Sequence, residues 1–324
     1  MEPTENKTIG AHFSAVVCEN KNSIKWDHEY ESARSALYAL IVKLRPEYVW
    51  IPYYVCGAVI DAVSQSRTAI KRYNIDAEFQ PVGDFSIGPN DFILLVNYYG
   101  LCSSKIKQQL ERFSREKVIV DCSQAFFDRD FDCLASIYSP RKFLPVPDGG
   151  AMFYKGDLPC SPSSNQDSIA RYQCLLQRVA DEPEVSREAY LASEHDFETV
   201  GMRRMSCFTR ILIHSMDLEY FASKRRENFL TLDSLKTVND LFFDLEESVP
   251  LCYPLITKKA TDLRQYLNRQ RVLTPMYWPN VQRAGAFESR LISDAVFLPI
   301  DHRYDVDDMV RIASLVKIFL GDNG

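Results

Sequence analysis

The chain has 324 residues, enough for about two domains with a large buried core, because domains average roughly 150 residues. Hydrophobic residues make up 46% and charged residues 25%, which excludes a chain that is disordered over most of its length. The formal net charge of -6 excludes a general electrostatic surface for nucleic acid or anionic membranes. Any phosphate group must therefore be bound by local groups.

The nine cysteines are scattered and form no C-x-x-C pair, which is typical of a reduced protein of the cytoplasm. The five histidines form no cluster at zinc-ligand spacing, so we expect no structural metal. Residues 1–13 lack the basic start and apolar stretch of a secretory signal, and no apolar run approaches the roughly 20 residues of a membrane span. We therefore expect a soluble, cytoplasmic protein.

The first half of the chain alternates helical and strand-like segments. Apolar residues recur at helical spacing over residues 31–44, 55–65 and 104–116. The β-prone runs lie at residues 48–52, 68–75, 91–100, 117–121, 133–139 and 150–155. Strands that alternate with helices require crossover connections, so we expect an α/β fold with a mostly parallel sheet.

The second half is expected to be mainly helical, with a small mixed region at the end. Residues 157–168 are rich in Pro, Ser and Asp and are expected to form a loop. Helical stretches follow at residues 168–182, 205–221 and 223–243. The last segments are predicted as strand, helix, strand and helix, at residues 249–256, 261–272, 294–300 and 305–320. We expect a large α/β domain over residues 1–221 and a small α+β domain over residues 222–324.

Polar side chains follow two of the expected strands, where ligands of open α/β sheets bind. Asp121 ends the run at 117–121, and Gln124 follows three residues later. Lys142 lies in the Pro- and Gly-containing turn SPRKFLPVPDGG between two β-prone runs. Taken singly, each has an ordinary explanation, because a strand-end Asp often caps a turn and a loop lysine is usually a surface residue.

Ser32 opens the first expected helix within the segment SARSAL. A serine there is an ordinary N-cap, and the start of a helix also binds phosphate through its N–H groups and dipole. The motifs G-x-G-x-x-G and G-x-x-x-x-G-K-[ST] are absent from the sequence. We therefore expect any phosphate to bind at this helix start.

In their order along the chain, these features resemble the DegT/DnrJ/EryC1/StrS family of pyridoxal-phosphate (PLP) sugar aminotransferases. The segments involved are SARSAL, VNYYG, the D-x-x-Q-A element at Asp121, and Lys142 six residues before Asp148-Gly149-Gly150. MRRMS at 202–206, AVFLPI and DVDDMVRI extend the resemblance over nearly the whole chain. It implies the PLP-dependent transferase type I fold, with a mostly parallel sheet of the seven-stranded type, flanking helices and a small C-terminal α+β domain.

The resemblance also implies roles for individual residues. Lys142 matches the lysine that binds PLP covalently, and Asp121 matches the carboxylate at the pyridine nitrogen. A carboxylate about 4 Å from that nitrogen stabilises its protonated form by roughly 4 kcal/mol, or about three pKa units, at an effective dielectric near 20. Gln124 matches the residue that hydrogen-bonds near the ring, plausibly at the phenolic oxygen. The expected phosphate contacts are Ser139 and the backbone N–H groups of Ala33, Arg34 and Ser35, with the Arg34 side chain as an additional charge.

The aromatic residue that stacks on the cofactor ring in this family is replaced here by Cys56, so Tyr53 or Tyr54 could supply the ring instead. Four further aromatic residues are candidates for the pocket wall, although such residues more often belong to the core. These are Tyr98, Tyr99, Tyr277 and Trp278.

Two phosphate-binding positions of the family also differ. Met202 stands where an Asn reaches the phosphate in the neighbouring subunit, and Arg203 or Arg204 could compensate because Met cannot donate a hydrogen bond. Ile137 stands at the position of the usual phosphate serine, which makes Ser139 a substitute.

The resemblance implies an aminotransferase that moves an amino group from an amino acid such as glutamate to a nucleotide-linked keto-sugar. The pathway would be surface-polysaccharide or secondary-metabolite biosynthesis, with Lys142 as the proton carrier. It further implies a homodimer, with much of the interface formed by residues 165–220, and no nucleic-acid or membrane partner. Two alternatives stay open: another PLP reaction, such as elimination, and a degenerate member without catalysis.

Overall fold

The computed structural model describes residues 24–321 with the exception of 84, 85, 130, 181, 182, 198, 242, 244, 246, 247 and 282. Residues 1–13, in which the sequence predicts no secretory signal, lie outside this range. Among the described residues, none of the helices combines the length and the apolar character that crossing a membrane requires.

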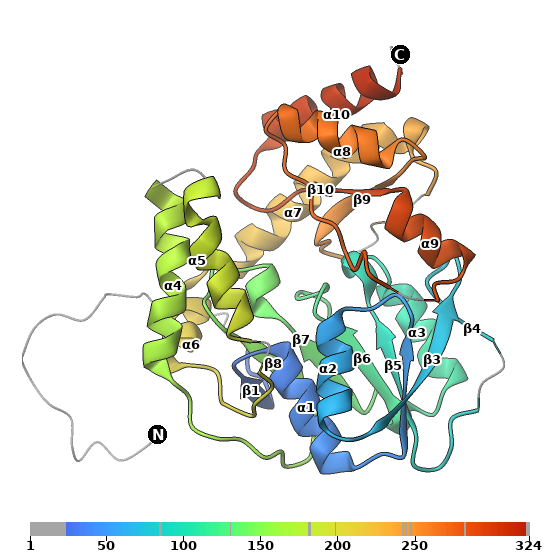
Figure 1. Cartoon of the computed structure of the whole chain (residues 1–324), viewed down its shortest axis with the longest axis vertical. Helices are drawn as coiled ribbons and strands as arrows, with labels where there is room; N and C mark the ends of the chain where they lie inside the picture. The colour runs from blue at the N-terminus through green and yellow to red at the C-terminus, as the bar shows by residue number, and fades with distance from the viewer. Residues whose placement is uncertain are drawn as a thin grey trace, which may run out of the picture.

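An eight-stranded sheet forms the centre of the larger part of the molecule (Figure 1). Its strands, in spatial order, are β1 (His28–Tyr30), β8 (Gly150–Phe153), β7 (Ala135–Tyr138), β6 (Val118–Cys122), β5 (Phe92–Val96), β2 (Tyr48–Pro52), β3 (Ala69–Ile75) and β4 (Pro81–Val82). The strands from β7 to β3 run parallel, whereas β8, β1 and β4 pair antiparallel with their neighbours. The mostly parallel α/β sheet is confirmed, and it has eight strands rather than seven because very short strands pair at both edges.

Crossover helices connect the parallel strands, as the alternating pattern predicts. They are α1 (Ala33–Leu44), α2 (Gly57–Gln65) and α3 (Ser103–Arg112). Helix α1 packs against α2 and against β8, which lie beside it in Figure 1. Every residue of β6 is buried, as expected for a strand covered on both faces.

A group of helices follows the sheet in the chain. It contains α4 (Asn165–Ala180), α5 (Pro183–His195), α6 (Cys207–Ser215) and α7 (Leu218–Leu232). The expected loop at 157–168 ends earlier, because α4 begins at residue 165, and α5 is not predicted from the sequence. The single helix expected over 205–221 is wrong, since Met216 is extended and the Asp217 side chain caps a new helix by accepting from the Tyr220 N–H at 2.9 Å.

The C-terminal part contains a two-stranded antiparallel sheet with helices around it, in the upper part of Figure 1. Its elements are β9 (Cys252–Ile256), α8 (Ala260–Arg269), α9 (Ala286–Ser293), β10 (Ala295–Pro299) and α10 (Val306–Leu320). The predicted order of strand, helix, strand and helix is present, with α9 as an addition. The expected domain boundary between residues 221 and 222 falls inside α7, and the division into two domains there stays a prediction.

Aromatic packing fixes the small sheet beyond the carboxyl ends of the central strands. Tyr99 follows β5, and its ring lies 4.9 Å from the ring of Phe297 in β10, between centroids. Both belong to one hydrophobic core that continues from the large sheet into the small one. The C-terminal part therefore lies over the edge of the sheet at which the central strands end, and the candidate polar residues lie at this edge.

The backbone at Gly149 and Gly150 lies directly against the start of helix α1. A Cβ atom at residue 150 would lie 2.0 Å from the carbonyl carbon of Ser32 and 2.3 Å from the nitrogen of Ala33. Gly149 has a φ of 129°, and its N–H donates to the carbonyl of Glu31 at 2.7 Å. Only glycine allows this contact, which places the start of α1 against the end of the turn that contains Lys142.

Replacing Gly150 by Ala should lower the free energy of unfolding by about 3 kcal/mol, because the added Cβ overlaps backbone that cannot move aside. Gly57→Ala is the matched control, since no atom lies within 4 Å of the added Cβ. The control should leave stability unchanged or raise it by up to about 1 kcal/mol. Urea unfolding followed by circular dichroism measures both, and equal midpoints for the two variants would contradict the close contact.

Candidate active site

Three cavities meet at Lys142, beyond the carboxyl ends of β6 and β7. The smallest, of about 180 Å³, is called the inner cavity. It brings together seven of the nine residues expected to bind the cofactor, namely Ala33, Arg34, Cys56, Asp121, Gln124, Ser139 and Lys142. Two expected site residues, Ser35 and Tyr54, are not among those that line it.

Lys142 lies in a single 3₁₀ turn, Pro140–Lys142, that follows β7 directly. Its backbone N–H donates to the carbonyl of Ser139 at 3.2 Å, which closes the turn. Its side chain is exposed and lines all three cavities. Within the described part of the chain, the ammonium group forms no hydrogen bond or ion pair, so it is available to a ligand.

Asp121 and Gln124 occupy the end of β6 and the turn after it, and both are buried. The Oδ1 atom of Asp121 accepts from the Ser123 N–H at 2.8 Å. The Oε1 atom of Gln124 accepts from the Tyr99 N–H at 3.0 Å, which fixes the amide plane. The Nε2 atom of Gln124 is buried, and no described residue accepts a hydrogen bond from it. An unpaired buried donor is costly, which points to a ligand acceptor in the inner cavity.

The start of α1 forms one wall of the inner cavity through Ser32, Ala33 and Arg34. The Oγ atom of Ser32 caps the helix by accepting from the Ser35 N–H at 3.0 Å, so this N–H is engaged within the chain. The Arg34 guanidinium donates to the carbonyl of Phe197, and its Nη2 lies 3.7 Å from Asp61 Oδ2. The positive end of the helix dipole therefore faces the cavity, while the Arg34 charge is shared with its own chain.

Two aromatic residues, Phe197 and Trp278, line the inner cavity, and Trp278 comes from the C-terminal part. Cys56, at the N-cap of α2, and Trp278 both line the inner cavity. Tyr54 is fully buried, its hydroxyl pairs with that of Tyr99 at 2.9 Å, and burial raises its pKa. Its ring also packs edge-on against Trp278, 4.7 Å away between centroids.

Of the four aromatic residues considered for the pocket wall, two belong to the core and two line cavities. Tyr98 and Tyr99 are fully buried. Tyr277 lines the two larger cavities, and Trp278 lines the inner one. The side chain of Trp278 projects from a residue with a φ of 51°, a conformation that is uncommon for a bulky residue.

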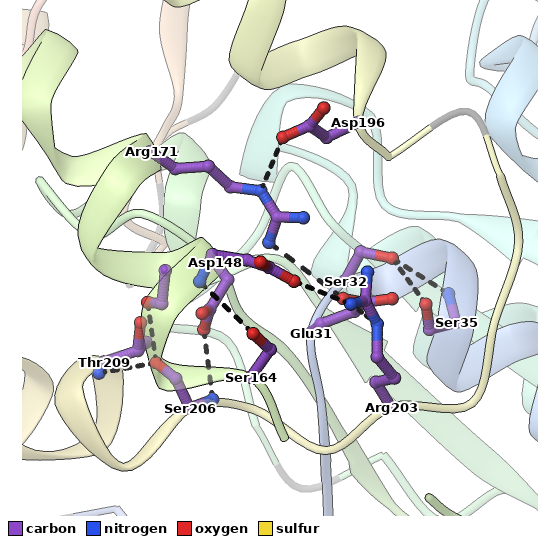
Figure 2. A network of polar contacts seen from close by, with 12 residues as sticks. Glu31, Ser32, Ser35, Asp148, Ser164, Arg171, Asp196, Arg203, Ser206 and Thr209 are labelled. Atoms are coloured by element: carbon purple, nitrogen blue, oxygen red, sulfur yellow. Dashed lines mark hydrogen bonds and ion pairs between the residues drawn. The ribbon is translucent and has the colours of Figure 1, made fainter. Parts of the chain in front are cut away.

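A polar network fixes the chain just before α1, as Figure 2 shows. The Oε2 atom of Glu31 lies 3.0 Å from Arg203 Nε and 4.0 Å from Arg171 Nη1, and Arg203 Nη1 contacts Asp167 Oδ2 at 2.8 Å. Burial raises the pKa of the Glu31 carboxyl, and the charge of Arg203 opposes this effect. The backbone N–H of Glu31 also donates to the carbonyl of Arg203 at 2.9 Å.

Arg203 is thus committed to ion pairs within its own chain. Arg204 is exposed, and its Nε donates to the Sγ atom of Cys160 at 3.0 Å. The carbonyl of Met202 accepts from the Ser161 N–H at 2.8 Å, so this segment pairs with the loop that precedes α4. Of the two arginines, Arg204 is the one that forms no ion pair among the described residues.

Sequence reasoning missed Arg141, which lines the inner cavity beside Lys142. Its guanidinium forms an ion pair with Glu194 and lies 4.1 Å above the ring of Phe197. Burial lowers the pKa of Arg141 to about 10, so the group stays charged at neutral pH. No sequence signal could identify these partners, because α5 itself is not predicted.

Glu31→Gln should lower the free energy of unfolding by about 2 kcal/mol, because it leaves the guanidinium groups of Arg203 and Arg171 without their shared carboxylate. Glu227→Gln is the control, because it makes the same chemical change in the surface ion pair with Lys224. It should have no measurable effect on the free energy of unfolding. Urea unfolding of the two variants measures the difference. If both variants unfold at the same urea concentration as the wild type, the network does not stabilise this region.

No protein-family model matches the chain, and no curated protein matches it in sequence. Solved structures do match over most of its length. A DegT DnrJ EryC1 StrS aminotransferase from Brucella abortus is 15% identical, with 91% of this chain and 86% of that chain covered and a TM-score of 0.62. PseC from Helicobacter pylori, an aminotransferase involved in the biosynthesis of pseudoaminic acid, is 16% identical, with 90% and 86% covered and a TM-score of 0.62.

NtdA from Bacillus subtilis, whose structure contains the bound cofactor PMP, is 18% identical, with 90% of this chain and 73% of that chain covered and a TM-score of 0.62. At such identities the similarity concerns the fold. The chain therefore has the fold of these aminotransferases, the PLP-dependent transferase type I fold, which confirms the fold class that the sequence resemblance implies.

Proposed function

We propose that the chain is a PLP-dependent aminotransferase that moves an amino group from an amino acid such as glutamate to a nucleotide-linked keto-sugar. The observation that carries this proposal is the inner cavity, where an unpaired lysine ammonium, a strand-end carboxylate and an unpaired amide donor meet. These groups belong to Lys142, Asp121 and Gln124. PseC, an aminotransferase of pseudoaminic acid biosynthesis, and NtdA, whose structure contains PMP, share this fold, which supports aminotransferase chemistry with this cofactor.

The residues of the inner cavity fit PLP group by group. The Asp121 carboxylate would pair with the pyridine nitrogen, and the unpaired Gln124 Nε2 would donate to the phenolic oxygen. Ser139 and the start of α1 at Ala33 and Arg34 would hold the phosphate. The Ser35 N–H is left out of this set, because it already donates to Ser32.

When bound, PLP supplies an electron sink for the charge that develops at the donor Cα. The chain would supply the proton chemistry, because the Nζ atom of Lys142 would take the proton from the donor Cα and deliver it to the C4′ atom of the cofactor. The Ser123 N–H holds the Asp121 carboxyl group in position at the wall of the inner cavity. Trp278 contributes an aromatic wall to the cavity from the C-terminal part.

The proposal predicts a half-reaction without any acceptor. Borohydride should fix PLP on the peptide that contains Lys142, and glutamate alone should convert the bound cofactor to its amino form with one equivalent of 2-oxoglutarate released. Lys142→Ala should slow this step by about a thousandfold or more, because it removes the proton carrier. Lys155→Ala, at a side chain that is 93% exposed, is the control and should react normally.

Absorbance spectra and mass spectrometry of the reduced peptide measure these outcomes. If borohydride fixes PLP on another lysine, Lys142 is not the residue that binds the cofactor covalently. If glutamate and a panel of other amino acids leave the spectrum of the loaded protein unchanged, another PLP reaction or a non-catalytic role replaces the transaminase proposal.

We further propose a homodimer of cytoplasmic location that forms through helices α4 to α6. Large apolar side chains are exposed on these helices, which is unusual for a surface that faces only water. They are Ile169, Leu176, Val179, Val185, Tyr190, Leu191 and Ile211. Covering this surface with the same surface of a second copy would bury these side chains around a two-fold axis.

Val179→Glu should therefore shift the protein from dimer to monomer at micromolar concentration, because a charge would have to be buried at the interface. Val179 is 87% exposed in the single chain. Val310→Glu, on α10 and 51% exposed, is the control and should leave the dimer intact. Sedimentation velocity measures both, and a wild-type protein that sediments as a monomer with cofactor bound would contradict the proposal.

A further inference from the structure

The C-terminal end of α5 lies against the inner cavity, on the side of the Lys142 turn. Glu194, in the last turn of α5, and Phe197, which follows the helix, both line this cavity. The Phe197 N–H donates to the carbonyl of Glu194 at 3.1 Å, so the two residues belong to one compact turn. Residues 194–197 are called the α5 end.

The α5 end contacts arginines from three other elements. The carbonyl of Phe197 accepts a hydrogen bond from the guanidinium of Arg34 in α1. The ring of Phe197 lies 4.1 Å from the guanidinium carbon of Arg141 and 4.4 Å from that of Arg171 in α4. The carboxylate of Glu194 forms the ion pair with Arg141. The α5 end therefore joins α1, the Lys142 turn and α4 at one wall of the inner cavity.

Arg141 is the residue through which the α5 end holds the Lys142 turn. It directly precedes Lys142 in the three-residue turn Pro140–Lys142. Adjacent residues share a planar peptide unit, so a side chain that is fixed at Arg141 restrains the backbone from which Lys142 projects. Among the ion pairs between described residues, the pair with Glu194 is the only one that this turn forms.

Glu194 also keeps two charged groups of the inner cavity apart. The side chain of Arg141 is 19% exposed, and a guanidinium that is mostly removed from water requires a nearby anion. Two carboxylates line the inner cavity, and they belong to Glu194 and Asp121. Without the Glu194 charge, Arg141 would be attracted to Asp121, which would draw the turn toward β6 and occupy the carboxylate that the proposed function assigns to the cofactor nitrogen.

We propose that Glu194 is a positioning residue for Lys142: by pairing with Arg141 it fixes the Lys142 turn and keeps the Arg141 guanidinium away from Asp121. The ring of Phe197 supports the same position, because a guanidinium is attracted to the face of an aromatic ring. Glu194 acts through Arg141 and does not need to touch the reacting atoms. The inference rests on the proposed function for the identity of the cofactor.

The rate at which the full chain, freed of cofactor, captures added PLP tests this role. Capture joins the Lys142 nitrogen to the aldehyde carbon of PLP with the loss of one water, and visible absorbance and borohydride fixation on the Lys142 peptide measure it. Glu194→Gln should slow capture by about fivefold or more, because the turn no longer holds Lys142 in one orientation. The circular dichroism of the bound cofactor should fall for the same reason.

Arg141→Gln provides a second, independent variant and should slow capture to a similar degree. In the protein with both substitutions the two effects should not add, because each substitution removes the same ion pair. Glu188→Gln, at an exposed position on the same helix, is the matched control and should capture PLP at the wild-type rate. Urea unfolding of every variant establishes that the protein measured is folded.

A merely structural role would lower the urea midpoint of Glu194→Gln and leave capture by the folded protein unchanged, and this result would overturn the proposal. Effects that multiply in the double variant, or a wild-type chain that fixes PLP on another lysine, would overturn it as well. Slower capture by Glu194→Gln in a protein whose cofactor glutamate does not convert would support the positioning role and refute amino transfer. Amino transfer by the wild type together with normal capture by both single variants would do the reverse.

Discussion

The contact between Gly150 and the first residues of α1 is the constraint on which the site depends. It brings a helix start from the beginning of the fold against a strand that follows the Lys142 turn, although the two are more than a hundred residues apart in the sequence. The Glu31 network fixes the same junction from the side of α4 and the segment around Arg203. An added methyl group at residue 150 would separate the helix dipole from the lysine and remove one wall of the inner cavity.

Two of the cavities at Lys142 differ in how their charged side chains are paired within the chain. The inner cavity combines one carboxylate, one amide and a helix start, and its cations Arg34 and Arg141 are occupied by neighbouring groups of the chain. A neighbouring cavity of about 650 Å³ on the side of the C-terminal part, called the outer cavity, instead contains the buried Arg225, whose Nε has no hydrogen-bond partner among the described residues. The cations of the inner cavity are thus paired within the chain, whereas the larger cavity contains a buried guanidinium with one unpaired nitrogen.

Much of this arrangement could be predicted because it depends on local pattern. The strand over residues 48–52 has the predicted bounds, and Asp121, Gln124 and Lys142 converge because parallel strands end at one edge of a sheet. The rest depends on contacts between distant segments. Helix α5 is only partly amphipathic, and its polar side chains pair with residues of other elements. The hydrogen bond from the Ser35 N–H to Ser32 Oγ follows from the geometry of the helix cap and not from the composition. The ring of Trp278 enters the inner cavity from the opposite end of the chain, which no local signal reveals.

One short segment connects the two cavities. Arg271, Leu273 and Tyr277 line the outer cavity, and the next residue, Trp278, lines the inner one. Arg271 and Trp278, which lie at the two ends of this segment, have positive φ angles, so its path is defined by two uncommon backbone conformations. Any ligand that displaces the segment from one side changes the wall on the other side. If ligands in the two cavities are coupled through this segment, thermodynamic reciprocity requires each to alter the affinity of the other by the same factor.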